Sequence, residues 1–393
     1  MTAPAPSAEV LGRLEKLIAF PTVSRDSNLG LIEWVRDELA RQGVASRLSY
    51  DDERRKANLF ATLGPLRPGG LVLSGHTDVV PVDGQDWKTD PFRAVIADGR
   101  VYGRGSADMK GFIAVVLAAV PKMLAGARAG DPPFHIALSY DEELGCVGAP
   151  RLIDDFRAAG IQPARCVVGE PTSMRLVNGH KGGIVHRCRV HGRAAHSALA
   201  PQGVNAISYA ALLITRLREI AQRLQRTEAP DAGYDVPHTT FNVGTISGGI
   251  ASNIVAELCE FRFDIRYLPS TSPQSLVEEL RATADELLAE MRAVAPEAAI
   301  TFERVGGILP LATDAAAPIV GEVSRLLGTT EAPTRVGFGT EAGLFDAAGI
   351  ATVICGPGSI AQAHKPNEFV SFEQLARCER FVEALIQQGP ACH

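Results

Sequence analysis

Three short apolar segments, each followed closely by a histidine or an acidic residue, limit most strongly what this chain can fold into. The segments are 71–73, 135–140 and 166–168, and the residues that follow them are His76 and Asp78, Glu142 and Glu143, and Glu170. Short apolar runs bounded by turn residues are typical of buried strands. With helical patterns between them, they predict an α/β domain. Because functional side chains collect at the carboxyl ends of strands in such sheets, we expect these residues to converge.

Apolar residues at helical spacing supply the rest of this domain. Helices are expected at 7–19, 29–43, 112–124, 315–327 and 372–387, and further strands at 58–63 and 352–355. Two more chemically useful residues lie in loops of the same domain, Asp108 before the helix at 112–124 and His364 after the strand at 352–355.

The character of the chain changes after residue 180, and this change predicts an inserted domain. Strands are expected at 184–190, 240–246, 257–265 and 299–305, with helices at 203–224 and 275–291. A strand–helix–strand–strand–helix–strand series is the ferredoxin-like arrangement, and the strand at 184–190 alternates as an exposed antiparallel strand does. A chain of 393 residues exceeds the size at which one core stops growing. We therefore predict a first domain of 1–180 and 307–393, interrupted by an insertion at 181–306.

Composition excludes several classes of partner and site. A net charge of −6 argues against binding to nucleic acid or to an anionic membrane. We find no apolar run near the ~18 residues of a membrane span and no secretory signal. The seven cysteines are widely spaced and never form a Cys-x-x-Cys pair, which favours reduced thiols in a cytoplasmic protein. Any metal ion must therefore be bound by histidines and carboxylates.

The histidines and carboxylates at the predicted strand ends form a ligand set that suits paired zinc-like ions. Two such ions about 3.5–4 Å apart acidify a shared water and polarise a carbonyl, and a free carboxylate nearby could carry its proton to a leaving amine. Each residue alone has an ordinary alternative. Asp108 could cap the next helix, the pair at 142–143 and Glu170 could be turn residues, and His364 could be a surface histidine. The placement of every acidic residue at the same end of a predicted strand favours a metal site.

Five motifs resemble the zinc aminoacylase and carboxypeptidase family of dinuclear metallohydrolases. They are SGHTDVVP at 74–81, GRGSADMKG at 103–111, DEE at 141–143, GEPT at 169–172 and AHKPNE at 363–368. The resemblance covers nearly the whole chain. It implies a zinc-peptidase-like catalytic domain with a mixed, mainly parallel sheet, and an inserted ferredoxin-like α+β domain that serves as lid and dimerisation domain.

The resemblance also implies a role for each motif residue and two divalent ions per chain, Zn²⁺ or alternatively Co²⁺. One ion would be bound by His76, Asp108 and Glu170, and the other by Asp108, Glu143 and His364. Glu142 would be the general base that serves the metal-bound hydroxide, and Asp78 would orient His76. Members of the family commonly have a cis peptide after the shared aspartate, here Asp108–Met109.

Other segments resemble the family's substrate-binding parts. His196 resembles a lid histidine that reaches the partner subunit's active site and stabilises the oxyanion. Asn253 and Arg266 resemble substrate-grasping residues, because an arginine fork can bind both oxygens of an α-carboxylate. Gly358 lies in a Gly-rich stretch whose amides could approach substrate. The alternatives are an exposed histidine, a strand-surface charge and a tight turn.

Several segments most resemble family members that deacetylate N²-acetyl-L-ornithine, among them the stretch that contains Thr340 and Glu341. Glu341 could bind a substrate δ-ammonium group, or it could be a carboxylate at a helix start. We predict a cytoplasmic homodimeric amidohydrolase that takes this small N-acyl amino acid and releases ornithine and acetate in arginine biosynthesis. A desuccinylase of succinyl-diaminopimelate, a broader N-acyl-amino-acid amidohydrolase, a dipeptidase and a metal-dependent binding or scaffold protein are the alternatives.

Overall fold

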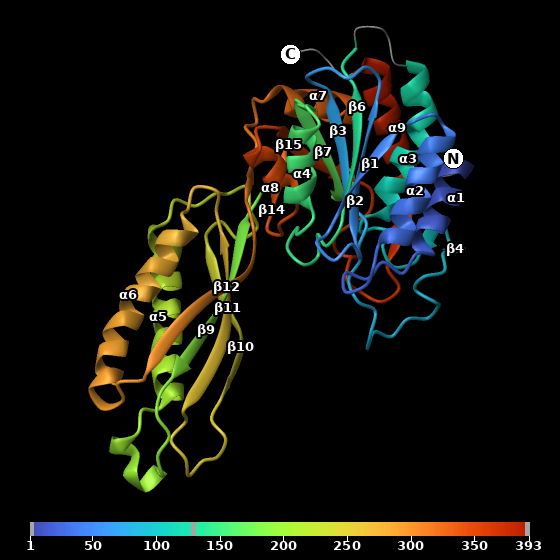
Figure 1. Cartoon of the computed structure of the whole chain (residues 1–393). Coiled ribbons are helices and arrows are strands. Elements are labelled where there is room, and N and C mark those ends of the chain that lie inside the picture. The colour runs from blue at the N-terminus through green and yellow to red at the C-terminus, as the bar shows by residue number, and fades with distance from the viewer. Residues whose placement is uncertain (1–3, 127–130, 390–393) are drawn as a thin grey trace. The chain divides into compact units, whose positions relative to one another are not determined.

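The computed structural model describes residues 4–126 and 131–389. The chain forms two compact units, which we describe separately (Figure 1). Unit 1 contains the chain up to Gly179, Leu311–Arg335 and the chain from Thr340 onward. Unit 2 contains His180–Pro310 and also Val336–Gly339, a short segment that lies outside the predicted insertion.

Unit 1 is built on a nine-stranded mixed sheet. Its strand order is β1-β2-β6-β3-β7-β15-β8-β13, with β14 paired to β8. The four central strands β6, β3, β7 and β15 run parallel, whereas β1 and β2 on one side and β8 on the other pair antiparallel. The bounds are β1 Ser46–Tyr50, β2 Ala57–Leu63, β3 Leu71–His76, β6 Phe134–Ser139, β7 Arg165–Pro171, β8 Val177–His180, β13 Leu311–Ala312, β14 Thr334–Val336 and β15 Ala351–Gly356. The predicted mixed sheet is thus confirmed, with its parallel part at the centre.

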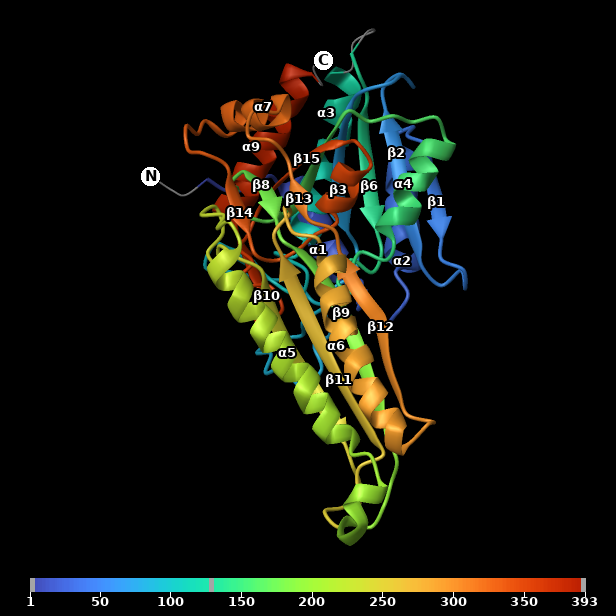
Figure 2. The ribbon, with the colours of Figure 1, turned by 90° about the vertical axis from the view of Figure 1, so that its left-hand side faces the viewer.

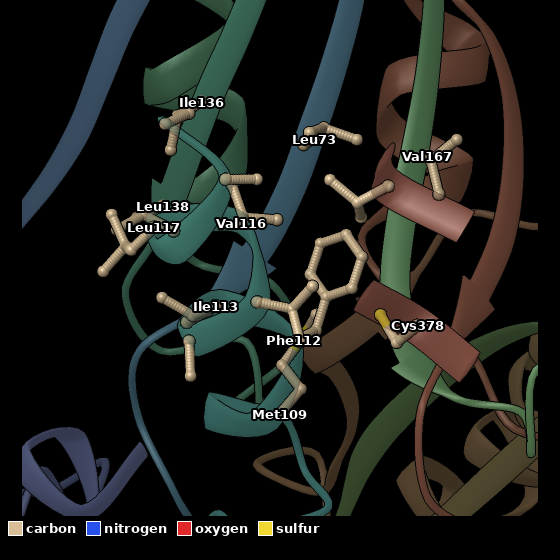
Figure 3. Close-up of a cluster of buried hydrophobic side chains, with 14 of the residues drawn as sticks. Leu73, Met109, Phe112, Ile113, Val116, Leu117, Ile136, Leu138, Val167 and Cys378 are labelled. Carbon is tan, nitrogen blue, oxygen red and sulfur yellow. The ribbon is translucent and has the colours of Figure 1, made fainter. Parts of the chain in front are cut away.

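Helices cover both faces of this sheet. The larger core contains residues of α1 (Ala8–Ile18), α2 (Leu29–Arg41), α3 (Lys110–Gly126), α7 (Pro318–Leu327) and α9 (Phe372–Gln388), and α4 (Ala149–Ala158) and α8 (Ala342–Ala347) contact each other on the opposite face. Helix α3 lies at the centre of the core: Phe112, Ile113 and Val116 pack against Leu73 and Val167 of the parallel strands (Figure 3). The first part of α3, from Lys110 to Val120, is buried except for Ala118, and it fixes the loop before it, which carries Asp108. A small sheet of β4 (Val95–Ala97), β5 (Arg100–Tyr102) and β16 (Phe369–Ser371) borders the same loop.

Unit 2 is a four-stranded antiparallel sheet in the order β10-β11-β9-β12. Its strands are β9 Gly182–His191, β10 Thr240–Gly248, β11 Leu258–Tyr267 and β12 Ala299–Ile308. Two long helices, α5 (Ala206–Thr227) and α6 (Pro273–Val294), lie along one face, as Figure 2 shows, and η1 (Ser197–Gln202) precedes α5. This is the predicted ferredoxin-like order. The predicted alternation and antiparallel pairing of 184–190 are confirmed. The strand β9 is central in the sheet, because it lies between β11 and β12 and buries Cys188 and Val190 against the helices.

Two further features concern the helices and the cysteines. Among the described residues, none of the helices has the length and apolar character that a membrane span requires. Six cysteines are buried and unpaired, and Cys392 lies outside the described residues.

Candidate metal centre

His76 is the last residue of β3, and two carboxylates from other loops face its ring. Its Nε2 lies 3.0 Å from Oδ1 of Asp108 and 3.8 Å from Oε1 of Glu170, the next-to-last residue of β7. All three side chains are buried, and one ligand atom from each lies within 4.8 Å of the others. The predicted convergence at the carboxyl ends of parallel strands is therefore present in this group.

A second group shares Asp108 with the first. Nε2 of His364 lies 3.4 Å from Oδ2 of Asp108 and 3.1 Å from Oε2 of Glu143. His364 itself is half-exposed, so this group borders solvent on one side. The two oxygens of Asp108 thus face two different histidines, as expected of a residue that bridges two cations, and its peptide bond to Met109 is cis, as the resemblance implies.

The carboxylate of Asp78 forms hydrogen bonds with the acidic loop, residues 141–143, and lies farther from the ring of His76. It accepts hydrogen bonds from the backbone N–H groups of Glu142 at 3.1 Å and Glu143 at 3.3 Å, and from the Ser24 hydroxyl at 2.7 Å. Nδ1 of His76 lies 2.9 Å from the backbone oxygen of Asp78 and 3.6 Å from its carboxylate. A donor–acceptor contact at Nδ1 leaves Nε2 for a ligand, so Asp78 orients His76 through its main chain.

Glu142 is buried beside both groups but belongs to neither. The Cys146 thiol lies 3.5 Å from its Oε1, and Lys56 pairs with the preceding Asp141 at 2.5 Å. Burial, together with the negative charges around it, raises the pKa of Glu142 well above its usual range. A carboxyl group with a raised pKa, free of ligation, is suited to accept and return protons near neutral pH.

The charges of the cluster fit divalent cations. Burial raises the pKa of Glu143 and, more strongly, of Glu170, because it disfavours the charged form. The negative charges of neighbouring carboxylates raise both pKa values further. Contacts with Asp108 and Glu143 raise the pKa of His364 to about 10. For Asp108, burial is outweighed by His364 and His76, which lower its pKa. The cluster contains more buried carboxylates than imidazoles, so bound cations would balance its negative charge. Its ligand atoms are nitrogen and oxygen, which suit Zn²⁺.

Sequence alone assigns no role to Glu368, yet it shapes the loop that carries Asp108. Its buried carboxylate accepts from the backbone N–H groups of Gly105 (3.0 Å), Ala107 (2.8 Å) and Asp108 (3.1 Å), and pairs with the buried Arg104 at 2.7 Å. Four donors thus converge on one side chain. Glu368 lies four residues after His364 in the chain. Its hydrogen bonds therefore connect the loop of His364 to the loop of Asp108.

Glu368→Gln should destabilise the protein and weaken metal binding. The neutral amide leaves Arg104 buried without its counter-charge, a loss of about 3 kcal/mol or more in the free energy of unfolding, and a misplaced Asp108 should cost about 10–100-fold in metal affinity. Denaturant unfolding and metal titration would measure both. The exposed Glu373, changed to Gln, is the matched control. Equal stability and metal affinity in the two variants would contradict the role given to Glu368.

Three other predicted residues of unit 1 lie close to these strands. Gly358 has φ 87°, and a Cβ there would lie 3.0 Å from that of Ala107, so it permits close approach to the Asp108 loop. The hydroxyl of Thr340 accepts a hydrogen bond at 3.1 Å from the N–H of Ala342, the first residue of α8. The Glu341 carboxylate, 1% exposed, accepts from the hydroxyls of Ser74 at 2.7 Å and Ser139 at 2.6 Å.

Glu341 therefore links β3, which ends at His76, to β6, which precedes the acidic residues 141–143. Burial raises the pKa of its carboxyl group, although the two serine hydroxyls oppose this shift. Its contact with a substrate ammonium group stays a prediction.

The remaining predicted residues lie in unit 2. His196 is exposed, and its Nδ1 accepts from the N–H of Ala198 at 3.1 Å at the start of η1. The backbone carbonyl of Asn253 accepts from Ser197 at 2.9 Å, so the segments of His196 and Asn253 lie side by side. Arg266 pairs with Asp264 at 3.0 Å on β11. Each of these three residues belongs to unit 2, whereas both metal groups belong to unit 1.

The chain is similar to known proteins over most of its length. The model of "Peptidase family M20/M25/M40" matches residues 72–388. An acetylornithine deacetylase of Pasteurella multocida is 36% identical over 389 residues, which cover 95% of this chain and 96% of that protein. An M20 family metallo-carboxypeptidase of Sulfolobus solfataricus has the same fold, with a TM-score of 0.76 at 19% identity over 97% of this chain and 99% of that one. A dinuclear metal-binding M20 peptidase of Bacillus subtilis gives 0.67 at 12% identity over 96% and 97%.

Proposed function

The chain belongs to peptidase family M20/M25/M40, and we propose that it is an acetylornithine deacetylase, which hydrolyses N²-acetyl-L-ornithine to L-ornithine and acetate. The observation that carries this proposal is full-length similarity to an acetylornithine deacetylase in a chain that keeps Glu142 beside two ligand groups. Arginine biosynthesis is the pathway this reaction would serve. The buried, unpaired cysteines support a reducing, cytoplasmic setting.

The proposed centre has two cation sites that share one residue. His76, Asp108 and Glu170 would hold one ion, and Asp108, Glu143 and His364 the other. Histidine nitrogen with carboxylate oxygen favours Zn²⁺, and Co²⁺ is the alternative. Two bound divalent cations would lower the pKa of a water molecule and polarise the amide carbonyl.

Glu142 is the proposed general base. Its carboxyl group would accept a proton from the attacking water and deliver it to the leaving α-amine, so that one side chain serves both halves of the hydrolysis. Asp78 supports this role, because its carboxylate fixes the backbone of Glu142 and Glu143 together. Glu142 could then carry the proton while Glu143 binds the metal ion.

Residues of unit 2 are proposed to bind the substrate and to join two copies of the chain. Arg266 would bind the α-carboxylate with its fork, Asn253 would hold the substrate, and His196 would donate to the oxyanion of the partner subunit. Exposed apolar side chains on and near β10 and η1 support a homodimer, because contact with a second copy would remove them from water. They include Leu199, Ile246, Ile250 (88% exposed) and Leu258.

Mixing two inactive variants tests whether His196 acts on the partner's site. A His196→Ala chain keeps its own Glu142, and a Glu142→Gln chain keeps His196, so a mixed dimer should contain one complete site. We expect the mixture, after subunit exchange, to show activity that neither variant has alone. If the mixture stays as inactive as its components, His196 does not act between subunits.

A substrate panel tests the proposed specificity. Steady-state kcat/KM should be measured on acetylornithine, succinyl-diaminopimelate, acetylmethionine and a dipeptide, with metal content determined on the same sample. We expect acetylornithine to be among the best substrates. A clear preference for one of the others would move the chain to a sister hydrolase of the family, and inactivity on all four with both ions bound would favour a binding or scaffold protein.

A further inference from the structure

Unit 2 contains a small cavity that no step of the proposed reaction uses. It has a volume of about 190 Å³ and lies between helix α6 and the strands β9 and β12. Its lining joins apolar Ile184 and Val277 to basic His186, Arg281 and Arg304. A cavity with two arginines and a histidine on an apolar floor has the composition of an anion site.

His186 is the buried member of this group. Its side chain is 6% exposed and stacks on Phe263, with ring centroids 5.5 Å apart and an interplanar angle of 13°. Among the described residues, nothing forms a hydrogen bond with its Nδ1. Burial and the charges of Arg281 and Arg304 lower the pKa of His186 to about 4, so the ring is neutral at physiological pH. An unpaired buried polar atom is costly and calls for a partner.

The two arginines also lack a charged partner within the described parts of the chain. Arg281 donates to the backbone oxygen of Phe302 at 3.3 Å and lies over its ring, and Arg304 donates to that of Gly306 at 3.4 Å. By contrast, arginines at alternate positions of β9 pair with glutamates: Arg187 with Glu303 at 3.1 Å and Arg189 with Glu260 at 2.8 Å.

The net charge around the cavity remains positive. Glu278 also lines it, but its single negative charge leaves +1 once the two arginines are counted and His186 is neutral. The register places Arg304 directly opposite His186 on the neighbouring strand, so the two project to the same side of the sheet. Arg281 approaches from α6, and three nitrogen donors therefore come from three different elements.

We propose that this cavity binds a small oxyanion, either a phosphate or a carboxylate, through Arg281, Arg304 and His186. Guanidinium groups match two oxygens of such an anion at once, and the neutral imidazole can donate one further N–H. The cavity belongs to unit 2 alone and shares no residue with the metal centre, so this inference is independent of the proposed deacetylase activity.

The Ile184 methyl group offers a local reporter, because it lines the cavity. Metal-loaded full-length protein, labelled at isoleucine δ1 methyl groups, should be titrated with inorganic phosphate and separately with sodium acetate, with sodium chloride matching ionic strength. The Ile184 resonance, assigned with Ile184→Val, should shift saturably with phosphate or acetate but not with chloride. Which of the two binds more tightly identifies the source of the oxyanion. The Ile220 resonance in the α5 core should not move.

Variants distinguish a built site from general ionic effects. Arg304→Gln removes one charged donor and should weaken the anion about tenfold or more. His186→Phe keeps the stack on Phe263 and removes the N–H, and it should weaken binding as well. Arg189→Gln, outside the cavity, is the matched control and should bind as the wild type does. Shifts that follow chloride, or that are equal in the Arg304→Gln variant and the wild type, would overturn the proposal.

Discussion

Glu142→Gln should retain two divalent ions per chain and lose at least about 100-fold in kcat on acetylornithine. The variant keeps the size and buried position of the side chain but cannot accept a proton, and proton transfer by a positioned group contributes about 10²–10⁴-fold. Metal retention is expected because Glu142 belongs to neither ligand group. Substrate binding should change little, so the loss should appear in kcat rather than in KM.

Glu143→Gln is the matched comparison, since the two residues are neighbours on the same loop and both backbone N–H groups donate to Asp78. That variant should lose metal from the site of His364 as well as rate. Metal analysis and steady-state kinetics on both proteins would separate the roles. Unchanged turnover in Glu142→Gln would remove it as the base, and metal loss from that variant would make it a ligand.

Asp108→Asn should weaken both ions at once, and this is the second large effect. Asp108 is the only residue shared by the two groups found among the described residues, and each of its oxygens faces a different histidine. Mutation of a residue that only forms a hydrogen bond with a metal ligand typically lowers metal affinity about 10–100-fold. Loss of the shared carboxylate, itself a ligand, should therefore lower metal affinity at least about 100-fold at each site. Activity should fall with it.

The measurement is metal content after dialysis against a weak chelator, together with the thermal midpoint in the presence and absence of added Zn²⁺. Wild type should be stabilised by the metal, as any ligand of the native state stabilises it, and the variant should lose most of this gain. Asp98→Asn changes an exposed aspartate of the same unit and serves as the control. A variant that retains one tightly bound ion would show that Asp108 does not bridge.

Much of the fold follows from local patterns in the chain. Helix α3 and strands β3 and β6 are visible in the sequence because each is long or apolar enough to show its period, and the parallel sheet then places His76 beside Glu170. The ferredoxin-like order of unit 2 is visible for the same reason. Very short strands such as β13 and β14 carry too few residues for a period, and they depend on pairing with β8.

The hydrogen bonds that position the ligand loops are harder to predict from the sequence, because they join residues far apart in the chain. Glu368 ends the motif at 363–368, but the sequence gives it no role; that role depends on hydrogen bonds from the backbone N–H groups of Gly105 and Ala107 to its carboxylate. Glu341 looks like a helix-start carboxylate, yet its partners are Ser74 and Ser139 on two strands. For His186, the pattern of β9 indicates a strand but leaves open which face is buried.

Two divalent ions that share Asp108 in unit 1 are the basis of the proposed chemistry. Anomalous diffraction from crystals of the Zn²⁺-loaded protein, measured on both sides of the zinc absorption edge, tests this arrangement most directly. We expect two anomalous peaks in each chain, one within about 2.0–2.2 Å of ligand atoms of His76, Asp108 and Glu170, and one equally close to Asp108, Glu143 and His364. A single peak, or peaks bound by other residues, would contradict this arrangement.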